Sequence, residues 1–426
     1  MPASHSPNTA AIDKLQPSDL ASEVERIVSH TPVFDIHTHL YPPSFQSLFS
    51  AGIDDLVIYH YLIAELFRSS DISIPAFWAM SKAQQADLIW DTLFVRNTPL
   101  SEACRGVLCV MTSFGLDPYA KTLQEARDFF RSSTPEQHLE RTMKLAGVTD
   151  IVMTNDVFSE EEAAYWGAGA PQHPKLHAAL RMDPLLNNWE HASAVLSARG
   201  YAAHHKLDQT GIASARKFID AWIGRMKPLY MAVSLPPAFR YPEDSVRARL
   251  IKEVVLPAGR DHKLPFSMMI GVRKAVHPEL KDAGDAVGHA DIITVERLCH
   301  ENPGNRFLVS MLSRENQHEL CVAARKFSNL MPFGCWWFLN NPSIIREITD
   351  ERLEMLGPTF IPQHSDARIL DQIVYKWKHS RHVIAGSLTE AYRALARDGF
   401  EVTTAQIERD VKRLFQDNFR HFAGIA

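Results

Sequence analysis

The chain has 426 residues, of which 46% are hydrophobic and 22% are charged. These values are close to those of ordinary soluble globular proteins and exclude a disordered, collagen-like or low-complexity chain, while the length is compatible with a single α/β barrel. The 45 basic and 50 acidic residues leave a net charge of −5, and no Lys/Arg-rich run is present. We therefore expect neither a nucleic-acid partner nor binding to an anionic membrane.

The sequence contains no recognisable membrane span or secretion signal. No stretch approaches the roughly 18 consecutive apolar residues that cross a bilayer, and the first 17 residues are polar. The five cysteines are an odd number without CxxC spacing, which disfavours both a disulfide framework and a structural zinc site. These features predict a cytoplasmic protein with reduced thiols.

Short apolar runs bounded by turn residues recur along the chain and alternate with segments of helical character. This alternation is typical of a parallel α/β fold, and nearly continuous apolar runs indicate strands that are covered on both faces. The eight runs predict a (β/α)₈ TIM barrel, in which reactive groups lie at the C-terminal ends of the strands. The runs are residues 32–37, 149–154, 176–181, 229–234, 265–271, 305–311, 329–335 and 359–364.

The gap between the first two runs is too long for one crossover helix. Helical spacing at 54–67 and 122–131, and the apolar segment 101–116, predict a helical insertion at about residues 50–145, laid over one mouth of the barrel. The last predicted element is a helix at 403–422, capped by Thr403 or Thr404, with Ile407, Val411, Leu414 and Phe415 forming its apolar stripe. The predicted organisation is an N-terminal extension at 1–30 and a catalytic barrel at 31–426.

The first run ends in a candidate metal-binding motif. Alternate side chains of an extended segment share a face, so His37 and His39 can both reach one cation with imidazole nitrogens. The alternative is that one histidine is a hydrogen-bonded core residue and the other a helix cap. The position at the end of the first barrel strand favours the metal site.

A third ligand is expected from another strand end. Asp366 follows the eighth run, and in a closed barrel that strand pairs with the first, which brings Asp366 beside His37 and His39. The alternatives for Asp366 are a helix N-cap and an ion pair with Arg368. The sequence thus predicts one divalent metal ion, with zinc as the expected ion.

Residues that would build a second metal site are missing. The fourth run and its continuation, 230–237, contain no lysine, and the sixth, 307–313, contains no histidine. A binuclear centre bridged by a modified lysine is therefore not expected.

Two arginines and a tryptophan pair follow other runs. Arg181 and Arg368 would face a cavity that holds a cation, which is explained if a carboxylated substrate binds there; the alternative is that they pair with Asp183 or Asp366. The indoles of residues 336–337 either belong to the core or stack on a sugar ring.

These motifs together resemble the uronate (glucuronate) isomerases, a branch of the amidohydrolase superfamily. The resemblance runs through most of the chain in order, although typical members are longer. In the fifth run Met269 stands where those members carry a histidine. The matching motifs are Phe34–Pro42 (FDIHTHLYP), His60-Tyr61, Thr154-Asn155-Asp156, Arg181-Met182-Asp183-Pro184, Trp336-Trp337-Phe338 and Ser365-Asp366-Ala367-Arg368.

The resemblance implies an amidohydrolase-like barrel that interconverts D-glucuronate and D-fructuronate, or D-galacturonate and D-tagaturonate, through an enediol. It implies that His37, His39 and Asp366 bind the metal and that Asp366 assists ring opening. Tyr61 would carry the proton between C2 and C1, which requires a lowered phenol pKa.

The resemblance also implies the substrate-binding residues. His60, Arg181 and Arg368 would bind the carboxylate and the hydroxyls, and Trp336 and Trp337 would line the pocket. The expected partner is a small-molecule uronate, and a homo-oligomer is left open. Two alternatives remain: a metal-dependent hydrolase or decarboxylase of the same superfamily, and a sugar-acid binding protein without activity.

Overall fold

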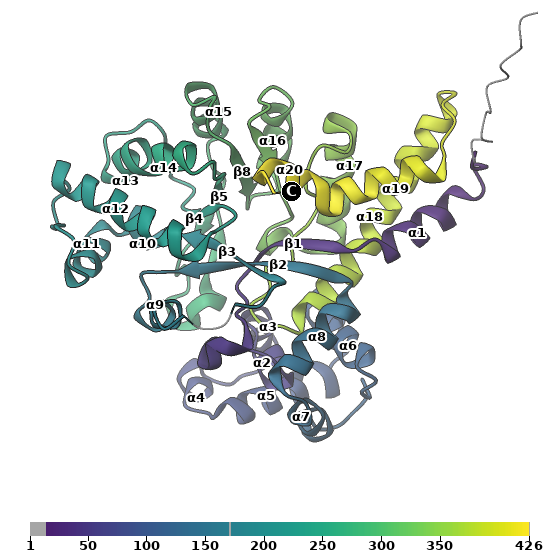
Figure 1. The fold of residues 1–426 in the computed structure, drawn as a ribbon. Helices are drawn as coiled ribbons and strands as arrows, with labels where there is room; N and C mark the ends of the chain where they lie inside the picture. The colour runs from purple at the N-terminus through teal and green to yellow at the C-terminus, as the bar shows by residue number, and fades with distance from the viewer. Residues whose placement is uncertain (1–13, 170–171, 426) are drawn as a thin grey trace, which may run out of the picture.

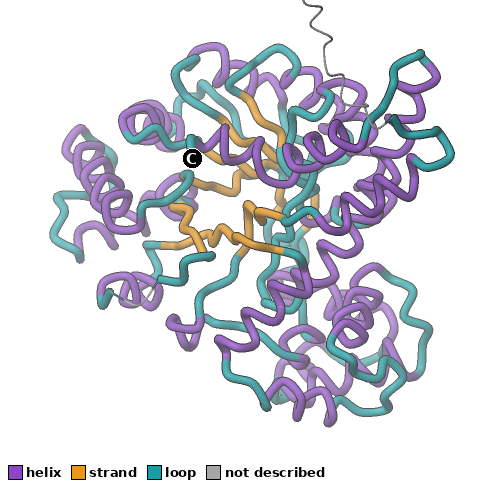
Figure 2. Tube along the Cα trace, turned by 45° about the vertical axis from the view of Figure 1, so that its right-hand side comes forward, coloured by secondary structure: helices purple, strands orange, loops and turns teal. Residues whose placement is uncertain are grey.

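The computed structural model describes residues 14–169 and 172–425, so the first 13 residues of the predicted extension lie outside it. A parallel sheet of seven strands forms the centre, in the order β1-β2-β3-β4-β5-β8-β9, and helices surround it (Figure 2). This confirms the predicted α/β barrel class, and each of the first seven predicted runs overlaps one strand. The strands are β1 Val33–Thr38, β2 Val148–Asp156, β3 Leu176–Arg181, β4 Met231–Leu235, β5 Phe266–Ile270, β8 Phe307–Met311 and β9 Leu330–Pro332.

The eighth predicted strand is wrong in detail, because residues 359–364 form an extended segment with a single bridge. Ile361 pairs with Phe333 of the segment that follows β9. Its N–H donates to the carbonyl of Pro332 at 3.1 Å, and its own carbonyl accepts from the N–H of Gly334 at 2.8 Å. One side of the segment is therefore tied to the end of the sheet.

The other side of this segment is tied to β1. The N–H of Asp366 donates to the carbonyl of His37 at 3.1 Å, and the N–H of His39 donates to that of Ala367 at 2.7 Å. A longer ladder does not form because Pro362 has no N–H and Asp366 has a φ of +51°, outside the β region. The same contacts place Asp366 next to the two histidines.

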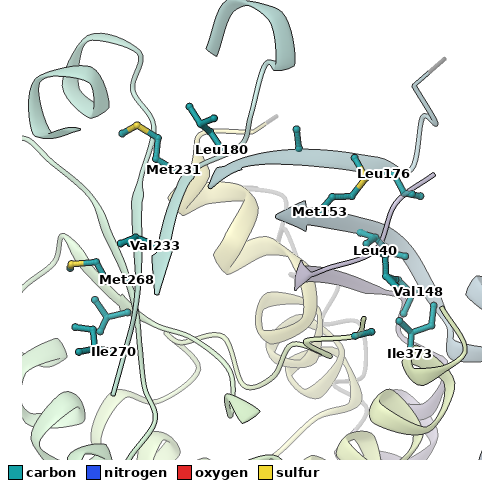
Figure 3. Packing of buried hydrophobic residues seen from close by; sticks show 14 of the residues in the cluster. Leu40, Val148, Met153, Leu176, Leu180, Met231, Val233, Met268, Ile270 and Ile373 are labelled. Atoms are coloured by element: carbon teal, nitrogen blue, oxygen red, sulfur yellow. The ribbon is translucent and has the colours of Figure 1, made fainter. Parts of the chain in front are cut away.

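The core lies on both faces of the strands. All residues of β1, β5 and β8 are buried, as expected for parallel strands with nearly continuous apolar character. Figure 3 shows Val233, Met268 and Ile270 of the neighbouring strands β4 and β5 packed close together. Such close packing fixes the strand ends that carry the polar side chains described below.

Between β1 and β2 the chain forms a group of short helices. Figure 1 shows α2 to α7 gathered on one side of the molecule. Hydroxyl caps begin several of them, with full capping boxes at Ser81/Gln84 and Thr134/Gln137. The helices are α2 Ile53–Val57, α3 His60–Ser69, α4 Ile74–Trp78, α5 Lys82–Trp90, α6 Glu102–Ser113, α7 Gln124–Arg131 and α8 Pro135–Ala146, after a 3₁₀ segment at Pro43–Leu48.

The remaining helices cover the sheet, and the long α18 packs against α1, α6, α8 and α17. A small antiparallel hairpin, β6 Val272–Arg273 with β7 Ala286–Val287, encloses a 3₁₀ segment at Pro278–Gly284. Among the described residues, no helix is long and apolar enough to span a membrane. The helices are α1 Leu20–His30, α9 Glu160–Gly167, α10 Asp183–Asn187, α11 Trp189–Ala198, α12 Gln209–Met226, α13 Val246–Leu250, α14 Leu256–Asp261, α15 Ile292–Glu301, α16 Asn316–Ala324, α17 Pro342–Leu356 and α18 Gln372–Arg397.

The predicted C-terminal helix is present as α19 Thr404–Lys412 and α20 Asn418–Ala423, joined by a π-helical turn at Arg413–Asp417. Thr403 is the cap. Its backbone N–H donates to the side-chain oxygen of Gln406, and the backbone N–H of Gln406 donates to the Thr403 hydroxyl. The predicted apolar stripe is buried.

Candidate functional site

Two histidines and one aspartate meet where β1 ends. The Nε2 atoms of His37 and His39 lie 3.7 and 3.3 Å from Oδ1 of Asp366, and one ligand atom of each residue lies within 4.8 Å of the other two. Oδ1 of Asp366 is buried and has no hydrogen-bond partner. The sequence thus correctly predicted that these three side chains come together.

Two hydroxyl groups orient the imidazoles. The hydroxyl of Tyr230 donates to the carbonyl of Ile36 at 2.7 Å and lies 3.1 Å from Nδ1 of His37. The hydroxyl of Thr154 donates to a β1 carbonyl at 2.9 Å and lies 2.8 Å from Nδ1 of His39. Since each hydroxyl proton is used, each hydroxyl accepts from an Nδ1–H, which assigns the tautomer and leaves both Nε2 atoms as acceptors.

This donor set fits a divalent cation. Two Nε2 lone pairs and a carboxylate oxygen converge, and such an arrangement is repulsive unless a positive charge lies among them. Burial lowers the pKa of His37 to about 3 and that of His39 well below its usual value, with nearby arginines acting in the same direction. Both imidazoles are therefore neutral, the form in which histidine binds metals.

A third histidine lies beside the cluster but outside it. The ring of His364 is 5.2 Å from that of His37, and both of its nitrogens are buried without a hydrogen-bond partner. Gly334, with a φ of +65°, is required underneath, because a Cβ there would lie 1.8 Å from Nδ1 of His364. Its place directly before Ser365-Asp366 was the only signal in the sequence.

A buried carboxylate joins β1 to the segment that carries Asp366. Asp35 accepts from the N–H of Ser365 at 3.0 Å and from the indole N–H of Trp377 at 2.8 Å. Burial raises the pKa of Asp35 to about 6, opposed by these hydrogen bonds. Asp35 thus fixes the position of Ser365 and Asp366 relative to β1, a function that no motif in the sequence indicated.

The two predicted substrate-binding arginines both have carboxylate partners. Arg181 makes two hydrogen bonds, of 3.0 and 3.1 Å, to Asp183, as the alternative interpretation of the sequence proposed. Arg368 pairs at 2.7 Å with Asp282 of the 3₁₀ segment and not with Asp366. About a third of each arginine side chain is exposed, so both guanidinium groups can still reach a ligand.

His60 and Tyr61 begin α3, and His60 faces Trp337. The rings of His60 and Tyr61 are 4.5 Å apart, the ring of Trp337 is 5.4 Å from His60, and Trp336 is next to Trp337. Nε2 of His60 is buried and has no hydrogen-bond partner. The ammonium of Lys274, which the sequence analysis missed, lies 5.5 Å above Trp337.

The expected lowering of the Tyr61 pKa is wrong for the structure as it stands. Burial raises this pKa well above its usual value, and Tyr59 and Asp366 act in the same direction. The phenol is therefore protonated around neutral pH, and its ionisation requires positive charge close to the ring or the oxygen.

A cavity of about 460 Å³ opens beside the start of α3. His60 and Arg368 line it, together with Tyr59 and Asp282. Arg368 is also the charged group that most strongly lowers the pKa of His39 after burial itself, so its guanidinium lies near the histidine cluster. The site offers a cation-binding cluster, two guanidinium groups, a phenol and indole faces.

Met269 of β5, which the resemblance places where a histidine is expected, is buried in the apolar core. Among the described residues, His37, His39 and Asp366 form the one group whose side chains are arranged to hold a metal ion.

Comparison with known proteins agrees with this geometry. The chain is similar to a uronate isomerase from Bacillus halodurans, with 51% sequence identity and a TM-score of 0.95 over 97% of this chain and 98% of that chain. No protein-family model matches the sequence, and no curated protein matches it significantly.

Two further solved structures share the fold. A uronate isomerase from Thermotoga maritima has 14% identity and a TM-score of 0.77 over 96% of this chain and 98% of that chain. A glucuronate isomerase from Caulobacter crescentus has 15% identity and a TM-score of 0.76 over 98% of this chain and 95% of that chain. At 51% identity over nearly the full length of the Bacillus protein, the chain belongs to the uronate isomerase family.

Proposed function

We propose that this protein interconverts D-glucuronate and D-fructuronate, or D-galacturonate and D-tagaturonate, by moving a proton between C2 and C1. The observation that carries this proposal is the cluster of His37, His39 and Asp366 at the end of β1, with Arg181 and Arg368 close enough to lower the pKa of both histidines. A cationic group for a carboxylate next to neutral imidazoles suits a sugar acid better than a neutral sugar.

Arg181 and Arg368 bind the substrate carboxylate and neighbouring hydroxyls in this proposal. Each now contacts a partly exposed aspartate, and ion pairs of this kind contribute little free energy, so a substrate carboxylate can take over the contact. His60 donates to or accepts from a sugar hydroxyl through its unpartnered Nε2. Trp336 and Trp337 form the wall against which the carbon skeleton packs.

His37, His39 and Asp366 hold one zinc ion in this proposal. When bound, zinc supplies a positive charge that orients the sugar oxygens. With Oδ1 of Asp366 directed at the two histidines, the second carboxylate oxygen is suited to accept the proton of the anomeric hydroxyl during ring opening. Ring opening produces the aldehyde that isomerisation requires.

Tyr61 then transfers the proton from C2 to C1. Its place at the start of α3, beside the ring of His60, holds it over one face of the substrate. Because burial raises its pKa, the transfer depends on cationic groups around it.

Incubation of the zinc-supplemented protein with both uronates tests this function. We expect at least one uronate to give the corresponding ketose, while glucose, which lacks the carboxylate, reacts poorly. Release of carbon dioxide or of a hydrolysis product would instead identify a decarboxylase or hydrolase. Saturable uronate binding without ketose formation would identify a binding protein.

A further inference from the structure

Lys376, on the second turn of α18, is a buried cation without an ionic partner. Its side chain is 3% exposed, and among the described residues it makes no ion pair and no hydrogen bond. Burying an ammonium group in this way reduces stability unless other interactions compensate. Unpaired buried charges of this kind are frequent at functional sites.

The groups around Lys376 belong to the proposed active site. Its Nζ lies 5.4 Å from the ring centroid of Tyr61 and 5.1 Å from that of Tyr375, within the range of cation–π attraction. After burial and Arg368, Lys376 is the group that most lowers the pKa of His60. The ammonium therefore lies between α18 and the start of α3.

A second helix of the insertion also faces this charge. The pKa of Glu102, at the start of α6, lies below its usual value. Burial acts to raise this pKa, and the positive charge of Lys376 is the strongest of the effects that lower it. The carboxylate nevertheless forms its contact with His379, at 3.7 Å, and not with Lys376. The positive charge of Lys376 thus remains available to the aromatic rings.

We propose that Lys376 is a positioning residue for Tyr61, holding the phenol ring by its face and stabilising the negative charge that develops on it. This inference rests on the proposed function. With Tyr61 ionised and its proton released to solvent, the phenolate takes the proton from C2, the C–H electron pair becomes the C1=C2 bond, and the C1=O1 π pair moves to O1 to give the enediolate. The hydroxyl proton of O2 then moves to O1, the freed electron pair on O2 forms the C2=O2 bond, and C1 takes the proton from the phenol, which leaves Tyr61 ionised again.

A cation is needed at this place because the protein interior opposes ionisation of Tyr61. A structural lysine would be expected to have a carboxylate or several carbonyl oxygens within hydrogen-bond distance of its ammonium, whereas this one lies over two ring faces and has no such partner among the described residues. The role predicts a specific combination of effects: removal of the charge slows proton transfer and leaves the fold as stable or more stable.

The test compares Lys376→Met with Lys378→Met, which removes the same charge from an exposed position on the same helix. We expect Lys376→Met to lower kcat about 10- to 100-fold and to leave KM within twofold. This loss is the size expected when one positive charge is removed 5.4 Å from the Tyr61 ring in a protein interior of intermediate polarity. The C2 deuterium isotope effect with [2-²H]glucuronate should increase, and the melting temperature should stay equal or rise. Lys378→Met should behave as the wild type.

A double-mutant cycle connects this effect to Tyr61. In a Tyr61→Phe background, Lys376→Met should cause no further loss of kcat. An equal loss in that background, a kcat within twofold of the wild type, or a lower melting temperature together with lower activity would each overturn the proposal.

Two controls separate the possible failures. If Lys376→Met is insoluble, Lys376→Gln is judged by the same criteria, and failure of both variants to fold would identify a structural lysine and refute the role. A wild-type protein that converts neither uronate would overturn both the proposed function and the role of Lys376. An active wild type with a fully active Lys376→Met variant would overturn only the latter.

Discussion

Replacement of Thr154 by valine tests how the metal site is organised. The hydroxyl of Thr154 lies 2.8 Å from Nδ1 of His39, and valine keeps nearly the same volume but cannot accept this hydrogen bond. The imidazole then loses the contact that fixes its orientation and its tautomer. Loss of such a contact behind a metal-binding histidine typically costs 10- to 100-fold in metal affinity, which corresponds to about 1.4–2.8 kcal/mol.

The same substitution also removes the 2.9 Å hydrogen bond from Thr154 to the carbonyl of Thr38. That loss should lower the free energy of unfolding by about 1 kcal/mol. A matched control is Thr149→Val. It removes the 3.2 Å hydrogen bond from the Thr149 hydroxyl to the carbonyl of Val33, at the opposite end of β2 from Thr154. It should have a similar or smaller effect on stability and no effect on metal binding.

Zinc affinity is measured by titration in competition with a chromophoric chelator, for the wild type and both variants at one pH. The expected order is weak binding for Thr154→Val and unchanged binding for Thr149→Val. Affinity of Thr154→Val within twofold of the wild type would refute the assignment of Nε2 as the ligand atom of His39. Equal weakening in both variants would show a general effect of the strand.

Three further predictions follow from the site and its support. Arg368→Met should raise KM for uronates about 10- to 100-fold in steady-state assays, and an unchanged KM would remove this guanidinium from carboxylate binding. Tyr61→Phe should lower kcat by about 10²- to 10⁴-fold with little change in the urea midpoint; near-normal turnover would assign the proton transfer to Asp366. The buried guanidinium of Arg381 donates to the carbonyls of Val28, Thr31 and Gly147. Arg381→Met should therefore lower the free energy of unfolding by about 3 kcal/mol in urea titrations. A loss below about 1 kcal/mol would contradict this.

The sequence predicted those parts of the molecule that depend on local patterns. Continuous apolar runs identified seven strands because parallel strands are buried on both faces. The alternate spacing of His37 and His39 predicted a shared direction, and barrel closure predicted that Asp366 lies beside them. The apolar character of residues 359–364 predicts a full strand where the structure has a single bridge, since the effect of Pro362 and of the left-handed φ of Asp366 depends on how the backbone pairs.

Other features depend on contacts between distant residues. Tyr230 contacts His37, which is 193 residues away in the sequence, and Asp282 pairs with Arg368, which is 86 residues away. No spacing rule connects such pairs, because the register of the strands and the path of the loops determine them. The raised pKa of Tyr61 likewise results from burial among aromatic side chains, which the His60-Tyr61 motif did not reveal.

Conversion of D-glucuronate and D-galacturonate in D₂O, followed by NMR, tests most directly whether a proton moves between C2 and C1 of a uronate. We expect the wild type to form a six-carbon ketose whose C1 carries the hydrogen from C2, with deuterium there only as far as the Tyr61 phenol exchanges with solvent during turnover, and Tyr61→Phe to form hardly any ketose. Loss of carbon dioxide, or recovery of both uronates unchanged and free of deuterium, would contradict it.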